Sequence, residues 1–328
     1  MIEFFKKLDE QIKQHDNVII IGHQNPDLDC IGSSLGLYKT IEKECYIFKT
    51  TDKLNESMKK AFNIIKEKNI NFIDKTNYKS IIKNTLLIVT DLHKKSLIEN
   101  QEILDNIKDV VIIDHHIIGQ DKIKNILEYI DPKASSATEI ITQYMRYKGK
   151  TVDKEIATIM IAGIEIDTNG YNMKTTEETF NSSAFLMSLG ADNILKQNIL
   201  KENKEEYIKR TKQIENSYML DDKMICVLDT KKYNPSYLAT MSEDLLRFED
   251  VEASFTIGRL INNKIGISAR SLGNINVELV MRELGGGGHL TDAACQIEEL
   301  GEDEEEKRIV LSLKEAEKKL IKVLKDVI

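Results

Sequence analysis

The chain has 328 residues, of which 41% are hydrophobic and 30% are charged. This length exceeds the usual size of one hydrophobic core, so we expect about two domains with an ordinary globular composition. The net charge of -8 argues against a broad basic surface for long nucleic acid. A local basic cleft that binds a small anion remains compatible with it.

The cysteine spacing and the lack of a signal peptide or a long apolar run predict a cytoplasmic location. Cys30, Cys45, Cys226 and Cys295 lie far apart without a Cys-x-x-Cys spacing, which argues against a zinc ribbon or a disulfide framework. We expect reduced thiols. The amino terminus turns polar too early for a signal peptide, and no run approaches the roughly 18 apolar residues of a membrane span. The sequence predicts a cytoplasmic protein with no membrane segment in this chain.

In residues 1–192, apolar runs alternate with amphipathic stretches, the pattern of a parallel sheet with helices on both faces. Four of the runs are expected to be strands, and each leads into Asp or His. Polar side chains at the carboxyl ends of parallel strands gather at one edge of the sheet, so one shared site is expected. The four runs are 18–21, 86–90, 110–113 and 161–166, and the side chains that follow them are His23, Asp27, Asp29, Asp91, Asp114, His115, His116 and Asp167.

The rest of the chain is predicted to form a helical linker and a smaller domain. Residues 193–220 are densely charged and favour a solvated helix that carries no chemistry. Residues 221–328 contain three strand-like runs, an acidic segment expected to be a surface loop, and a final amphipathic helix. We therefore expect a second, smaller α/β domain.

Imidazole and carboxylate ligands together favour a borderline-hard divalent ion, with Mn²⁺ the preferred choice. Asp27 and Asp29 are two residues apart, so in an extended turn they point in divergent directions and can serve two different ions. A pair of ions stabilises both the attacking and the leaving oxygen in hydrolysis, which favours phosphate esters as substrates. The sequence therefore predicts two divalent metal ions.

The second domain carries two candidate anion-binding features. A run of four glycines, 285–288, lets backbone amides approach a phosphate or ribose closely, and His289 adds a side-chain donor. Arg270 ends an apolar strand and suits bidentate phosphate binding, with a surface salt bridge as the alternative. Metals on one domain and a clamp on the other would fit a small di- or oligonucleotide.

These motifs resemble those of the DHH phosphoesterase superfamily and its associated DHHA1 module. The resemblance rests on His-x-x-x-Asp-x-Asp at 23–29, on Asp91, on the triplet Asp114-His115-His116 and on Asp167. In the second domain it rests on 268–271 and 285–289. Residues 22–33, 130–139, 162–168 and 267–294 look most similar to the catalytic part of the membrane-anchored cyclic-di-AMP phosphodiesterases of Gram-positive bacteria.

The resemblance implies a role for each site residue. His23, Asp27 and Asp91 would hold one ion, and Asp29, Asp91, His115 and Asp167 the other, with Asp91 bridging. Asp114 would orient the histidines, and His116 would contact the reacting phosphoryl oxygen or the leaving group unless it is a structural histidine. The active site would be a cleft between the domains, and the residues implied in substrate binding are Arg270, Ser271, Gly286, Gly287, Gly288 and His289.

The function implied is hydrolysis of cyclic di-AMP to linear pApA, with a further step to AMP left open, by a hydroxide activated at a dinuclear manganese centre. The alternatives are a nano-RNA hydrolase or a phosphatase for 3'-phosphoadenosine 5'-phosphate, and a non-catalytic nucleotide sensor. The anchored enzymes carry transmembrane, PAS and cyclase-like domains ahead of the catalytic part, so the chain is either a stand-alone enzyme or a catalytic piece. The acidic stretch 174–179 departs from the anchored family. Whether the protein acts as a monomer or a homodimer stays open.

Overall fold

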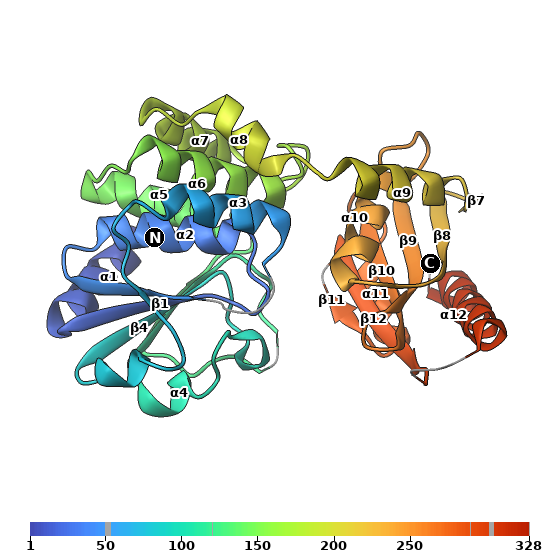
Figure 1. The fold of residues 1–328 in the computed structure, drawn as a ribbon, viewed down its shortest axis with the longest axis horizontal. Coiled ribbons are helices and arrows are strands. Elements are labelled where there is room, and N and C mark those ends of the chain that lie inside the picture. The colour runs from blue at the N-terminus through green and yellow to red at the C-terminus, as the bar shows by residue number, and fades with distance from the viewer. Residues whose placement is uncertain (50–53, 120, 289, 302–304, 328) are drawn as a thin grey trace. The chain divides into compact units, whose positions relative to one another are not determined.

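The computed structural model divides the chain into two compact units, Met1–Lys201 and Glu202–Ile328 (Figure 1). The boundary falls inside the predicted linker, whose two helices are not free in solvent. Helix α8 (Asn193–Leu200) buries Ile199 in the core of the first unit, and α9 (Lys204–Ile214) buries Arg210 in the second. The structure describes residues 1–49, 54–119, 121–288, 290–301 and 305–327.

The first unit contains a fully parallel sheet, which confirms the predicted α/β class. Its three central strands, at 17–21, 85–90 and 110–114, are largely β-branched and buried, as expected for a parallel sheet covered by helices and loops. In sheet order the strands are β3 (Phe72–Ile73), β2 (Glu44–Phe48), β1 (Asn17–Ile21), β4 (Thr85–Thr90), β5 (Val110–Asp114) and β6 (Leu127–Ile130).

Long helices cover one face of this sheet and short ones the other (Figure 1). The long helices are α1 (Ile2–Gln14), α2 (Leu28–Thr40), α3 (Glu56–Ile65), α5 (Ala137–Lys148), α6 (Lys154–Asp167) and α7 (Glu177–Ser188). The opposite face is covered by η1 (Tyr78–Ser80), η2 (Lys95–Leu97) and α4 (Ile103–Asn106).

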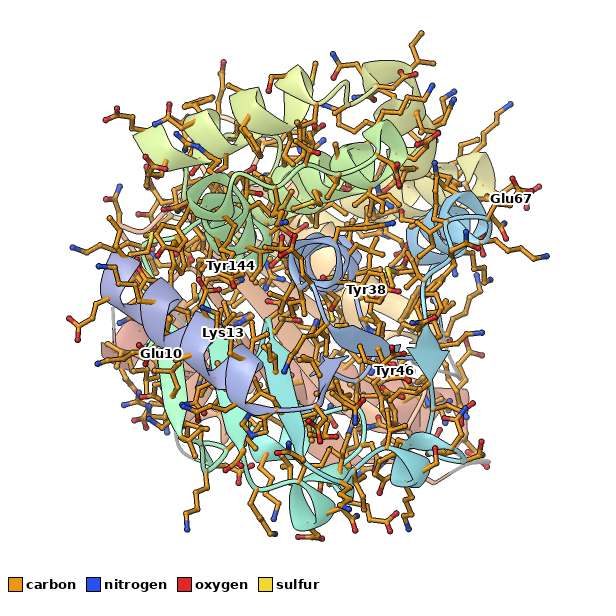
Figure 2. The ribbon with its side chains drawn as sticks, turned by 90° about the vertical axis from the view of Figure 1, so that its left-hand side faces the viewer. Glu10, Lys13, Tyr38, Tyr46, Glu67 and Tyr144 are labelled. Carbon is orange, nitrogen blue, oxygen red and sulfur yellow. The ribbon has the colours of Figure 1, made fainter. Side chains whose placement is uncertain are left out.

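Helix α1 is held to α5 by its apolar face and by polar contacts of Asp9 with Tyr144 and Lys148. The ring of Phe5 packs on Tyr144 with the centroids 5.2 Å apart. The hydroxyl of Tyr144 donates to Asp9 Oδ1 over 2.5 Å. Figure 2 shows Tyr144 beside α1, whose exposed side carries Glu10 and Lys13. The amphipathic helix therefore closes this part of the core.

The predicted strand at 161–166 is wrong, because this run lies inside helix α6. Helix α6 packs among α2, α5, α7 and α8, so apolar residues surround it and the helical periodicity disappears. A Cβ at Gly163 would lie 2.7 Å from the carbonyl oxygen of Leu28, which shows how closely α6 approaches α2. Asp167 is therefore presented by the end of a helix and not by a strand.

The second unit is smaller and contains a mixed sheet with helices on both faces. Strands β8 and β9 are parallel and their other neighbours antiparallel. In sheet order the strands are β11 (Gly287–Gly288), β12 (Asp292–Glu299), β10 (Lys264–Ser271), β9 (Ala253–Leu260), β8 (Lys223–Tyr233) and β7 (Ser217–Leu220).

Two separate apolar clusters stabilise this unit. One lies between the sheet and helices α11 (Val277–Glu283) and α12 (Glu306–Val327), and the other lies under α10 (Pro235–Leu245). Within the described ranges of the whole chain, no helix has both the length and the apolar character needed to cross a membrane.

Candidate metal centre

Three neighbouring strands deliver polar side chains to one edge of the parallel sheet. His23 lies just beyond β1, Asp91 directly follows β4, and Asp114 is the last residue of β5. Asp91 has a left-handed backbone (φ 62°), which Asp tolerates better than most residues, and its N–H donates to the Ile113 carbonyl. The strand order thus brings the predicted residues together.

The Asp91 carboxylate lies at the centre of the group. It is 3% exposed, its Oδ2 is 3.3 Å from His23 Nε2, and its Oδ1 is 3.4 Å from His115 Nε2. Among the described residues, neither Asp91 Oδ1 nor His115 Nε2 has a hydrogen-bond partner. Buried polar atoms without partners are costly, so their presence at one point favours a bound ion as the missing partner.

Two sets of ligand atoms flank this carboxylate. On one side, His23 Nε2 lies 4.0 Å from Asp27 Oδ1. On the other, His115 Nε2 lies 3.1 Å from Asp167 Oδ2 and 3.8 Å from Asp29 Oδ2. The structure therefore brings together all six residues that were predicted to bind metal.

Asp27 and Asp29 differ in how they are held. Asp27 caps α2, and its Oδ1 accepts the backbone N–H groups of Asp29 and Cys30, both over 3.0 Å. Asp29 is fully buried, and its two oxygens accept the N–H groups of Ala137 (2.7 Å) and Thr138 (2.8 Å) at the start of α5. Each oxygen of Asp29 keeps a second lone pair, and Asp27 keeps its other oxygen, Oδ2, so both residues retain the capacity to bind an ion.

The crowded charges shift the pKa values of the acids. Burial and the charge of Asp91 raise the pKa of Asp27 to about 6. Burial together with Asp91 and Asp167 raises the pKa of Asp29. Burial would raise the pKa of Asp91 too, but its contacts with His115 and His23 outweigh burial and lower it.

The pKa values of His23 and His115 are raised, although burial alone would lower them. Burial lowers the pKa of His23, but the hydrogen bond to Asp91 and the charges of Asp27 and Asp91 raise it to about 10. The pKa of His115 is raised because Asp167 and Asp91 outweigh its burial. Protons therefore supply the positive charge that a cation would supply, and metal binding would release them. The donor set fits a divalent metal ion that accepts imidazole and carboxylate.

Asp114 lies behind the ligands and orients two histidines. Its Oδ1 accepts from His116 Nδ1 over 2.7 Å and its Oδ2 from His93 Nδ1 over 2.5 Å. The Gly119 N–H donates to His93 Nε2, so His93 carries its proton on Nδ1. Burial would raise the pKa of Asp114, but these contacts lower it. The buried carboxylate thus fixes the loop that follows β5.

A pocket of about 280 Å³ opens over this centre. His116 lies at its wall with its side chain 41% exposed. Leu92, Lys94 and Leu97 also line it. His116 is therefore placed to reach a bound substrate, and Lys94 brings a cationic side chain to the same pocket.

In the second unit, Arg270 is already paired. Its Nε lies 3.1 Å from Glu243 Oε1 and 3.2 Å from Asp292 Oδ1, and it lines a pocket of about 450 Å³. Ser271 is fully buried, and its hydroxyl donates to the Leu290 carbonyl. The structure thus gives Ser271 a packing role instead of an accessible position for substrate.

At two of the predicted substrate-binding glycines, the packing of the backbone leaves no room for a side chain. A Cβ at Gly286 or at Gly288 would collide with the backbone of β12. At Gly287 a Cβ would meet no atom within 4 Å, and this residue is exposed. His289 lies outside the described residues.

The sequence reasoning assigned no role to His93, Lys94 or Cys30. The sequence does contain an indication for His93, because this residue lies two positions after Asp91. Lys94 and Cys30 had none, because a single lysine after a strand and a single cysteine in a helix occur in most proteins.

Residues 17–164 match the family model described as DHH family, N-terminal domain, and residues 222–328 match the DHHA1 domain. The chain contains a DHH domain followed by a DHHA1 domain. The resemblance inferred from the sequence motifs is thereby confirmed for both domains. The DHH match spans β1 to β6 and most of α6, so it contains every candidate metal ligand except Asp167.

Two curated relatives of this DHH protein differ in length. It is 36% identical over 319 residues to the cyclic-di-AMP phosphodiesterase PdeA of Listeria monocytogenes, covering 93% of this chain and 48% of PdeA. It therefore spans about half the length of that relative. It is 29% identical to the bifunctional oligoribonuclease and PAP phosphatase NrnA of Mycoplasma genitalium, covering 85% of this chain and 87% of NrnA.

A solved structure shares the fold over nearly the full length. The exopolyphosphatase-related protein from Bacteroides fragilis has a TM-score of 0.77 at 21% identity, with 98% of each chain covered. At this identity the likeness establishes the DHH–DHHA1 fold and leaves the substrate open.

Proposed function

We propose that the chain is a divalent-metal-dependent phosphodiesterase that hydrolyses cyclic di-AMP to linear pApA. The observation that carries the proposal is the buried Asp91 carboxylate between His23 and His115, with Asp91 Oδ1 and His115 Nε2 lacking partners among the described residues. The substrate is suggested by PdeA, a relative named for cyclic di-AMP that aligns with 93% of this chain.

The proposed ligands form two sets that share Asp91. One set consists of His23, Asp27 and Asp91, and the other consists of Asp29, Asp91, His115 and Asp167. Mixed imidazole and carboxylate donors favour Mn²⁺ over Mg²⁺, which prefers oxygen and water. Bound ions would activate water and offset the charge that develops on the phosphate oxygens.

His116 is proposed to transfer a proton to the leaving oxygen. Asp114 Oδ1 accepts from its Nδ1, which fixes the orientation of the ring. Protonated His116 then carries its second proton on Nε2, the atom that would donate to the leaving group. His93 holds the other oxygen of Asp114 and supports this arrangement as a positioning residue.

The second unit is proposed to bind a part of the substrate that does not react. Arg270 offers a guanidinium in a pocket of about 450 Å³, and Gly287 offers exposed backbone. Because Arg270 pairs with Glu243 and Asp292, a phosphate must compete with these carboxylates for it. We therefore expect a contribution to specificity that is smaller than that of the metal ligands.

A second candidate keeps the chemistry and changes the substrate. This chain covers 87% of the Mycoplasma NrnA, an oligoribonuclease and PAP phosphatase, whereas it covers 48% of PdeA. The activities in the name of this relative suggest short linear RNA or 3'-phosphoadenosine 5'-phosphate as substrates. The two candidates differ in whether a cyclic dinucleotide is opened faster than a linear one is cut.

Product analysis tests these proposals directly. The full chain with Mn²⁺ would be incubated with equal concentrations of cyclic di-AMP, cyclic di-GMP, pApA and 3'-phosphoadenosine 5'-phosphate. We expect cyclic di-AMP to be consumed fastest and pApA to accumulate. Asp91→Ala serves as the control for a contaminating nuclease.

Other outcomes would redirect the assignment. Faster conversion of pApA or of 3'-phosphoadenosine 5'-phosphate would select the second candidate. Tight binding of cyclic di-AMP without any product would select a nucleotide sensor and overturn the enzymatic proposal.

A further inference from the structure

One buried thiol lies among the ligands of the metal centre and has no part in the function proposed above. The ligand atoms of His23, Cys30 and Asp91 all lie within 4.8 Å of one another. Cys30 is 4% exposed. A free cysteine is commonly a small apolar residue in a core, but here the groups within ligand distance are an imidazole and a carboxylate.

Cys30 lies in the first turn of α2, and its sulfur packs against Gly22 at the end of β1. The Cys30 N–H donates to Asp27 Oδ1 in the first turn of α2, over 3.0 Å. A Cβ at Gly22, just after β1, would collide with the Cys30 sulfur. The same Cβ would lie 3.8 Å from the carbonyl oxygen of Thr90, which precedes Asp91. The sulfur therefore lies beside the ends of β1 and β4, the strands that deliver His23 and Asp91.

The Asp91 carboxylate contacts both candidate ion positions, with Oδ2 3.3 Å from His23 Nε2 and Oδ1 3.4 Å from His115 Nε2. Its side chain is buried, and its Oδ1 has no hydrogen-bond partner among the described residues. An ion bound beside His23 would reach a nitrogen, a carboxylate oxygen and a sulfur. The group formed by Asp29, His115 and Asp167 offers nitrogen and oxygen atoms.

We propose that Cys30 is a metal ligand and that the position formed by His23, Cys30 and Asp91 prefers a thiolate-binding ion such as Zn²⁺, Fe²⁺ or Co²⁺. As the sulfur–metal bond forms, the S–H bond breaks and its proton leaves to solvent. Thiolate selects these ions over Mn²⁺ and Mg²⁺, whereas the position around His115 keeps ordinary nitrogen and oxygen selectivity. This inference rests on the metal centre of the proposed function and makes its two positions chemically unequal.

Cobalt provides a readout that is independent of activity. The metal-stripped full chain would be titrated anaerobically with Co²⁺ while near-ultraviolet absorption is followed. We expect a thiolate-to-cobalt charge-transfer band in the wild type that Zn²⁺ removes by displacement. Cys30→Ser should lose this band while still binding Co²⁺.

Cys45 provides the matched control, because it is a buried cysteine of the same unit on β2. Cys45→Ser should keep the band. Zn²⁺ affinity should fall on the order of tenfold or more in Cys30→Ser. Mn²⁺ affinity at the remaining position should stay within about threefold, since that position contains no sulfur ligand.

The wild-type titration decides the proposal even if Cys30→Ser fails to fold. Full Co²⁺ loading of the wild type without a charge-transfer band would overturn it, and so would a band that persists in a folded Cys30→Ser. If cyclic di-AMP is hydrolysed but no band forms, this inference fails alone. If the band forms but no substrate is hydrolysed, the proposed function fails and the site stands as a metal-binding site.

Discussion

The two units differ in how the charges of their candidate binding residues are compensated. In the first unit, Asp27, Asp29, Asp91 and Asp167 converge on a pair of histidines, and buried polar atoms are left without partners among the described residues. In the second unit, the charge of Arg270 is balanced by Glu243 and Asp292. A bound cation would complete the first arrangement, whereas Arg270 in the second already has its counter-charges.

This contrast indicates where binding free energy is available. An ion that enters the first unit satisfies groups that are already buried and desolvated, so little of its gain is lost. A phosphate that reaches Arg270 must displace carboxylates that already compensate the guanidinium. The metal centre should therefore dominate catalysis, and the second unit should adjust specificity.

The most severe test of this contrast is Asp91→Ala. Because this carboxylate lies between both ligand sets, we expect kcat for cyclic di-AMP to fall more than about a hundredfold, or over ~2.7 kcal/mol of barrier. Bound metal, measured by elemental analysis, should fall as well. The exposed Asp105→Ala on α4 is the matched control and should keep both. If Asp91→Ala kept two bound metals and a tenth of the activity, the proposal that Asp91 bridges the two ions would be wrong.

Metal replacement tests the same centre without mutation. After complete stripping, we expect no activity, with Mn²⁺ restoring it far better than Mg²⁺ because imidazole ligands suit Mn²⁺. Saturation at a hundred times the dissociation constant should also stabilise the fold by about 2.7 kcal/mol, visible as a higher Tm by calorimetry. Equal rates with Mn²⁺ and Mg²⁺ would show that the imidazole ligands do not select Mn²⁺ over Mg²⁺.

Arg270→Ala probes the second unit. We expect kcat/KM for cyclic di-AMP to fall about ten- to a hundredfold, because a charge-assisted contact contributes roughly 1.5–3 kcal/mol. Hydrolysis of bis-p-nitrophenyl phosphate, which needs the metals alone, should stay within about threefold.

Glu243→Gln supplies the converse experiment. It removes one carboxylate that competes for Arg270, so KM for cyclic di-AMP should fall. Equal damage to both substrates in Arg270→Ala would move Arg270 from substrate binding to stability of the second unit.

The smallest effect is expected for Lys94→Ala. Lys94 lines the pocket over the metal centre and is partly exposed, so its attraction for a phosphate is screened and contributes about 0.5–1 kcal/mol. KM should rise about two- to fivefold with kcat unchanged, and the rise should shrink at high salt. The neighbouring Lys95→Ala, which changes an exposed lysine, should leave KM unchanged. A loss in kcat would instead place Lys94 in the chemistry.

Local patterns predicted the parts of the molecule that depend on neighbouring residues. The β-branched runs of β1, β4 and β5 identified three strands, and the strand ends pointed to His23, Asp91 and Asp114. Helix α6 was missed because a helix buried on all sides has the same continuous apolar sequence as a buried strand.

The sequence pattern did not predict hydrogen bonds between residues that lie far apart in the chain. Arg270 meets Glu243, which lies 27 positions away, and Asp29 meets Thr138, which lies 109 positions away. A motif can suggest that Asp29 binds metal, but the second use of its carboxylate depends on where α5 packs. The sequence therefore predicted the polar centre better than it predicted how each acid is held.

The hydrogen bonds between Asp29 and the start of α5 determine which residues an inactive descendant could lose without losing the fold. Its two oxygens accept the first N–H groups of a buried helix, and loss of such a cap typically costs about 1–2 kcal/mol of stability. A lineage that no longer needed catalysis could exchange the partly exposed His23 at little cost to the fold, whereas a change at Asp29 would release a helix from the core. An inactive descendant should therefore keep this aspartate long after its other ligands have gone, and its presence alone would be a poor sign that an enzyme is still at work.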